Sequence, residues 1–234
     1  MRGRARRVIE SLRWVMAFGR WPESAARLVA RWIPGDVLWY VDTDESVFAL
    51  TYDDGPSPET TPGLLDVLAA HRAKATFFLV GERVRAHPEV VAAVAGAGHE
   101  LGNHLMRDER SVSLPVERFR RELGEVNGLL EAYGVVRWFR PGSGWYTPGM
   151  VRAAADLGLR GVLGTLATAH DGGSGDAGIV PWLVREVRPG SILVLHEGGA
   201  SRRGVVTATD ELLTGLAARG LSAVTVSELV SRRR

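Results

Sequence analysis

The chain has 234 residues, of which 45% are hydrophobic, and its formal net charge at pH 7 is +2. This length and apolar content suffice for one well-buried domain with an appendage. The positive charge comes from arginine, with Lys74 the only lysine, and it does not favour nucleic-acid binding, which usually shows a concentrated basic face. Because the chain lacks cysteine, it has no disulfide, no thiolate zinc site and no cysteine nucleophile.

Residues 1–45 are predicted to form an N-terminal basic helical extension. Charged residues such as Glu10 and Arg20 interrupt every apolar stretch, so we expect neither a signal peptide nor a membrane-spanning helix. Apolar residues recur at helical spacing opposite arginines, which is typical of a helix packed on a domain or of an amphipathic helix on a membrane surface. We favour the packed helix, and we expect a cytoplasmic protein or one peripheral to the membrane.

The remaining residues, 46–234, are predicted to form one catalytic domain of the α/β class. Short β-branched or aromatic runs alternate with helical patterns, which is typical of parallel strands joined by crossover helices. Seven strands are expected, at 47–52, 75–80, 99–103, 136–139, 161–166, 191–195 and 222–226. Six helices are expected, at 62–70, 87–95, 115–133, 147–157, 179–187 and 205–218.

Two adjacent carboxylates, Asp53 and Asp54, follow the first predicted strand, and like charges this close repel each other unless a cation relieves them. His104 and Asp108 are spaced i,i+4, so one turn of helix or a tight loop would place both on one face. We therefore predict one divalent metal ion bound by Asp54, His104 and Asp108. Asp53 would be left as a base, with an open coordination position for water.

Further polar residues follow later strands: Arg140 the fourth, Asp171 the fifth and His196 the sixth. In a barrel of parallel strands, the carboxyl ends meet on one face, which is where such folds place their active sites. Residues more than a hundred positions apart are thus predicted to form a single site.

Four motifs in this order resemble those of the polysaccharide deacetylase family, also described as the nodulation-type deacetylase domain or carbohydrate esterase family four. They are TYDDGP at 51–56, GHELGNH at 98–104, FRPGSG at 139–144 and VLH at 194–196. The resemblance runs from about Val47 to the segment 225–229. It implies an irregular (β/α) barrel of about seven parallel strands, related to the TIM barrel.

The resemblance also implies an activity, the metal-dependent removal of an N-acetyl or N-formyl group from an amino sugar or polysaccharide. Asp53 matches the base of the family pattern, Arg140 the residue that orients it by a bidentate contact, and His196 the acid that protonates the leaving amine. Asp171 matches only by its order in the chain. Either Asp171 or Glu197 would raise the pKa of His196.

Substrate contacts are expected from the glycine-flanked turn, where the backbone amide of Ser143 would donate to the developing oxyanion. Many family members carry an aromatic residue where this chain has Ser143, and Trp145 follows close behind as a substrate contact. Asp108 stands in place of a second histidine ligand. A harder, more anionic ligand set widens the expected metal from zinc towards cobalt, nickel or manganese.

Two other functions stay open. The first is an amidase acting on a lipid-linked sugar or a small non-glycan amide, which the lack of an export signal favours. The second is a catalytically dead glycan-binding protein. Binding alone would not require all five of the residues Asp53, Asp54, His104, Arg140 and His196. Their presence argues against the second alternative. The expected partner is an N-acylated sugar or glycan.

Overall fold

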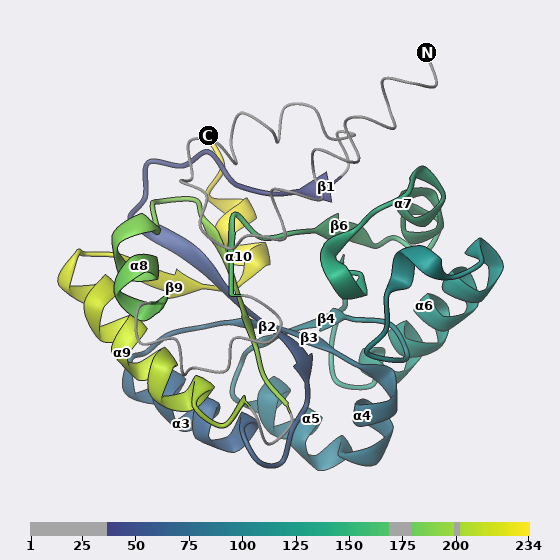
Figure 1. Cartoon of the computed structure of the whole chain (residues 1–234), viewed down its shortest axis with the longest axis horizontal. Coiled ribbons are helices and arrows are strands. Elements are labelled where there is room, and N and C mark those ends of the chain that lie inside the picture. Colours follow the sequence, from purple (N-terminus) through teal and green to yellow (C-terminus); the bar gives the residue numbers. More distant parts are fainter. Residues whose placement is uncertain (1–36, 169–178, 199–201) are drawn as a thin grey trace.

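A computed structural model describes residues 37–168, 179–198 and 202–234. Its described strands form one nine-stranded sheet in the order β1-β6-β5-β4-β3-β2-β8-β7, with β9 pairing β2 beside this path. Every strand pair is parallel. Helices surround the curved sheet in Figure 1. The predicted fold class, an irregular (β/α) barrel of parallel strands, is therefore confirmed, with nine strands in the described residues where about seven were expected.

The strands are short except for β2, which pairs with the three strands β3, β8 and β9. Their bounds are β1 Val37–Leu38, β2 Val47–Gly55, β3 Thr76–Leu79, β4 Glu100–Asn103, β5 Trp138–Phe139, β6 Arg160–Val162, β7 Leu166–Ala167, β8 Ile192–His196 and β9 Ser222–Val224. The helices are α3 Thr61–Ala70, α4 Gly81–Ala86, α5 Pro88–Gly96, α6 Val116–Glu131, α7 Pro148–Ala155, α8 Ile179–Glu186, α9 Val205–Ala218 and α10 Val226–Ser231, with 3-10 turns η1 Ser111–Ser113 and η2 Gly142–Gly144.

Side chains of β2 alternate between two apolar clusters, because successive residues of a strand face opposite sides of the sheet. Phe48 and Leu50 belong to the large cluster that the surrounding helices cover. Val47 and Ala49 belong to a second cluster, which includes residues of β6, β8, β9 and α10. Asp53 has the parity of Val47 and Ala49, so the alternation places its side chain on the inner side of the curved sheet.

The predicted strand at 161–166 is in fact two strands, β6 next to the end strand β1 and β7 at the other end of the sheet order. β6 pairs with β1 and β5, whereas β7 pairs with β8. The chain crosses from β6 to β7 at Gly164, where an added Cβ would collide with the side chain of Val194. The sequence does not reveal this crossing, because an apolar run does not show which strands β6 and β7 will each pair with.

The other predicted strands and helices exist, with ends that differ by up to three residues. The structure adds the short strand β1, the helix α4 directly after β3, and the helix α10, which begins at Val226 with a capping box between Thr225 and Glu228. The predicted basic helix lies outside the described residues, and the division at residue 45 stays a prediction, although β1 already belongs to the sheet. Within the described ranges, no helix is long and apolar enough to cross a membrane.

Candidate active site

Polar side chains gather at the carboxyl ends of neighbouring strands, as the sequence predicts. Asp53 and Asp54 end β2, His104 follows β4, Arg140 follows β5, and His196 ends β8. Strands β2 and β8 are neighbours, and their register pairs Asp53 directly with His196. The predicted base and the predicted acid, 143 positions apart in the numbering, thus occupy facing positions on adjacent strands.

Asp53 is buried and is held by a single contact from Arg140. Arg140 Nη1 donates to Asp53 Oδ1 at 2.5 Å and to Thr51 Oγ1 at 2.8 Å. Arg140 Nε donates to the carbonyl of Val162 at 3.3 Å, and the guanidinium lies 4.2 Å from the ring centroid of Phe78. The expected bidentate contact is not formed, because only Nη1 reaches the carboxylate. The buried Nη2 has no hydrogen-bond partner among the described residues.

Asp54 breaks the alternation of β2. Its φ of 68° is left-handed, and the register with β3 shifts between Asp53 and Gly55. The two successive carboxylates therefore do not follow the alternation of a regular strand. Asp54 Oδ1 lies 3.2 Å from Nε2 of His104, and Arg202 Nη1 donates to Asp54 Oδ2 at 2.5 Å.

Burial and neighbouring charges shift the pKa values of Asp54 and His104 in opposite directions. Burial alone would raise the pKa of Asp54, but contact with His104 and the positive charges of His104, His196 and Arg202 hold that pKa well below its ordinary value. For His104, burial would lower the pKa, but the carboxylates of Asp53 and Asp54 raise it above its ordinary value. Asp54 is therefore a carboxylate at any ordinary pH, and it is a strong acceptor for a cation.

The pair of Asp54 and His104 suits a divalent metal, because a carboxylate oxygen and an imidazole nitrogen are both common zinc ligands. The other ring nitrogen of His104, Nδ1, is buried without a hydrogen-bond partner among the described residues.

The predicted third ligand is not brought to this pair. The side chain of Asp108 is 34% exposed, and its Oδ2 lies 3.9 Å from Nη2 of Arg83. Over the described ranges, no group of three His, Cys, Asp or Glu side chains is arranged to hold a metal ion. The described residues thus do not assemble the predicted three-ligand site, and coordination by Asp108 stays a prediction.

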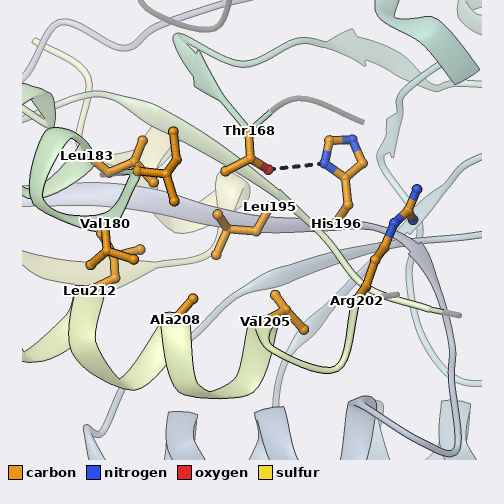
Figure 2. A pocket seen from close by; sticks show the side chains of 10 residues that line it. Thr168, Val180, Leu183, Leu195, His196, Arg202, Val205, Ala208 and Leu212 are labelled. Atoms are coloured by element: carbon orange, nitrogen blue, oxygen red, sulfur yellow. Dashed lines mark hydrogen bonds between the residues drawn. The ribbon is translucent and has the colours of Figure 1, made fainter. Parts of the chain in front are cut away.

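His196 lines a mostly apolar cavity, whose lining side chains are drawn in Figure 2. Its Nδ1 lies 3.3 Å from Thr168 Oγ1, which follows β7. The cavity, of about 30 Å³, lies between β8, α8 and α9, and its apolar wall includes Leu183, Leu195 and Leu212. Arg202 also lines it. A volume of this size accepts a small apolar group or about two waters.

The remaining predicted site residues are placed only in part. Ser143 lies in η2, whose Gly142 packs so closely against the carbonyl of Glu109 that a Cβ would collide with it. Trp145 follows η2 and is half-buried. Asp171 lies outside the described residues, so its support of His196 stays a prediction, as does the oxyanion role of Ser143.

Three residues of the site were not predicted: Arg83, Arg202 and Thr168. Arg83 Nη1 donates to the backbone carbonyl of Asp54, and Arg202 Nη1 also donates to the carbonyl of Glu197 at 3.0 Å. All three follow strand ends, so the rule that found Asp53 would apply to them as well. Arg83 was missed because the helix α4, which carries it, was itself not predicted.

The sequence of the chain matches the model of the polysaccharide deacetylase family over residues 40–162. A peptidoglycan-N-acetylglucosamine deacetylase of Bacillus cereus is 34% identical over 204 residues, which cover 84% of this chain and 93% of that protein. A chitooligosaccharide deacetylase of Rhizobium leguminosarum bv. trifolii is 35% identical over 159 residues, which cover 67% of this chain and 74% of that protein.

Solved structures give the same result. The structure resembles that of a peptidoglycan N-acetylglucosamine deacetylase in complex with 4-naphthalen-1-yl-N-oxidanyl-benzamide, with a TM-score of 0.80, 26% identity, and coverage of 87% of this chain and 100% of the other. It also resembles a pseudoenzyme of carbohydrate esterase family four from Bacillus anthracis, with a TM-score of 0.77, 26% identity, and coverage of 86% and 71%. The chain belongs to the polysaccharide deacetylase family.

Proposed function

We propose that this protein hydrolyses the N-acetyl or N-formyl group of an amino sugar within a glycan, with one divalent metal ion as cofactor. The observation that carries the proposal is the pairing of Asp53 with His196 across β2 and β8, beside the Asp54 and His104 pair. The named activities of the relatives, on peptidoglycan and on chitooligosaccharides, support a glycan substrate.

The metal would be held by Asp54 and His104, with Asp108 as the proposed third ligand. When bound, such an ion supplies a Lewis acid that polarises the amide carbonyl. The same donor types admit zinc, cobalt, nickel or manganese. Zinc stays the expected ion, with cobalt, nickel or manganese as alternatives for this oxygen-rich ligand set.

Asp53 would act as the general base. It takes one proton from water while the water oxygen bonds to the amide carbon. Arg140 holds the Asp53 carboxylate through Oδ1, so its other oxygen is left to accept this proton. Ser143, through its backbone amide, would donate to the carbonyl oxygen as negative charge develops there.

His196 would act as the general acid. It gives a proton to the amide nitrogen as the carbon–nitrogen bond breaks, so the products are a free carboxylic acid and the amine of the sugar. Thr168 contacts Nδ1 of His196 and would orient the ring so that Nε2 faces the leaving group. A proton passes from Asp53 to the products or solvent, and a second returns to His196, before the next turnover.

The test is an assay of acetylated chito-oligosaccharides and peptidoglycan after chelator treatment, with zinc, cobalt, nickel or manganese restored singly. We expect activity to return with metal and to be lost in both Asp53→Asn and Asp54→Ala. Only Asp54→Ala should also lose the metal. The exposed Asp66→Asn is the matched control and should behave as the wild type. Activity that persists in Asp53→Asn would show that Asp53 is not the base.

The likeness to a pseudoenzyme makes a glycan-binding protein without turnover the second candidate. That candidate predicts saturable binding of chito-oligosaccharides without release of acetate in any of the four metals. Turnover of a small amide or of a lipid-linked sugar, but of no free glycan, would instead support the amidase alternative.

A further inference from the structure

A fully buried carboxyl group, that of Glu197, follows His196 in the chain, and beyond the prediction that it or Asp171 raises the pKa of His196 it has no part in the chemistry described above. Glu197 is 0% exposed. Its Oε2 accepts a hydrogen bond from Thr61 Oγ1 at 2.6 Å and a longer one from Thr60 Oγ1 at 3.3 Å. Buried carboxyl groups are rare unless their partners are provided, so this arrangement calls for a reason.

The partners of Glu197 belong to the segment that leaves the active site after β2. Thr60 and Thr61 stand at the start of α3, six and seven residues after Asp54. Thr61 Oγ1 also accepts from the backbone amide of Ser57 at 2.9 Å, within the same segment. The Glu197 carboxyl is therefore bonded to the loop that follows the two aspartates.

The backbone near Glu197 makes the same connection. The Glu197 amide donates to the carbonyl of Asp53 at 3.0 Å, and the Gly198 amide donates to Thr60 Oγ1 at a long 3.4 Å. The carboxyl packs directly on Gly55, where an added Cβ would collide with Oε1. Side chain and backbone of one residue thus join the end of β8, the end of β2 and the start of α3.

We propose that Glu197 is a positioning residue, whose buried side chain fixes the loop from Gly55 to Thr61 against the end of β8 and so sets the placement of Asp53 relative to His196. This inference rests on the proposed deacetylase function, because it assigns these two residues as base and acid. It extends that function to a residue that touches neither substrate nor reacting atoms.

The length of the side chain matters more than its full charge. Burial raises the pKa of Glu197 to about 7, against the opposing effect of the Thr61 and Thr60 hydroxyls. A neutral glutamine of the same length keeps an oxygen that can accept from Thr61. Aspartate is one methylene shorter, so its oxygens cannot reach Thr61 and contact Gly55 without a shift of the backbone.

The experiment compares Glu197→Gln, Glu197→Asp and Thr61→Val with the wild type and with the exposed control Glu89→Gln, all as the full chain reconstituted with one metal. For Glu197→Asp and Thr61→Val, we expect kcat to fall about 10- to 100-fold while KM stays within about threefold, because a displacement near 1 Å costs about that much in rate. Glu197→Gln should keep kcat within about threefold.

Backbone amide exchange of residues 55–61 gives a second measurement that does not depend on activity. We expect exchange to become about tenfold faster in Glu197→Asp and Thr61→Val, and to stay unchanged in Glu197→Gln and Glu89→Gln. Unchanged exchange, or a kcat that falls only in proportion to the unfolded fraction, would overturn the inference. If the wild type shows no turnover with any of the four metals, the proposed function is contradicted instead. The exchange data would still decide whether Glu197 fixes the loop.

Discussion

The buried ion pair between Asp53 and Arg140 predicts a strong energetic coupling between the two side chains. Their side chains are 6% and 3% exposed, and the contact is 2.5 Å long. Replacement of Arg140 by methionine leaves the Asp53 carboxylate buried without this cation. Breaking a buried pair in this way costs about 3–5 kcal/mol. For a chain of this size, that corresponds to a fall in Tm of about 6–20 °C.

The reverse replacement, Asp53→Asn, should cost less, about 1–3 kcal/mol, because Arg140 keeps other partners. These are the hydroxyl of Thr51, the carbonyl of Val162 and the face of Phe78. In the double variant, neither charge remains to be left unpaired. We therefore expect the double variant to lose about 2 kcal/mol less than the sum of the two single losses.

Urea unfolding of the four proteins at pH 7 measures this coupling. The matched control is the exposed pair of Arg120 and Asp156, whose contact is 3.0 Å long. Arg120→Met should cost no more than about 1 kcal/mol. Single losses for Arg140→Met and Asp53→Asn that add within about 0.5 kcal/mol would refute the coupling, since independent sites add to that accuracy.

Three further predictions follow from single side chains. Arg202→Met should tighten metal binding about tenfold in a chelator competition, because its guanidinium contacts the Asp54 ligand at 2.5 Å; weaker binding would contradict this. Burial lowers the pKa of His99 to about 4, so the wild type should lose stability to urea as pH falls from about 6.5 to 4, and His99→Gln should lose less over that range; equal losses would exclude this role. Gly164→Ala should cost about 1–3 kcal/mol in unfolding experiments because its Cβ would collide with a β8 side chain, whereas Gly128→Ala, with open space in α6, should gain about 0.5–1 kcal/mol; equal effects would refute the steric argument.

Much of the barrel could be predicted from the sequence because each strand is a short apolar run and each helix has a clear periodicity. The pairing of strands could not be predicted in the same way. The crossing at Gly164, which divides 160–167 between β6 and β7, depends on contacts with β1 and β8 that are distant in the chain. The two-residue strand β1 is too short to leave a periodic signal.

The site shows the same division. The carboxylates of β2 and the histidine of β8 were predicted from their positions at strand ends, but their direct register depends on long-range strand pairing. Arg83 was missed because the helix α4 that carries it was not predicted, and Arg202 reaches Asp54 from a segment that follows β8 by several residues. Asp54 takes a left-handed backbone conformation within the folded strand. The Asp-Gly-Pro sequence alone does not distinguish this conformation from an ordinary turn.

The residues of the site differ in how firmly the fold fixes them. Asp53 and His196 stand on the paired strands β2 and β8, whereas Asp108 and Ser143 lie in the loops that follow β4 and β5. These two loops touch where Gly142 packs on the backbone of Glu109. The predicted third metal ligand and the predicted oxyanion donor are therefore adjacent to one contact, and a shift of either loop must disturb the other. Loops tolerate sequence change better than paired strands. We therefore expect family members that act on different substrates to differ in the residues of this contact, while the base and acid stay in place.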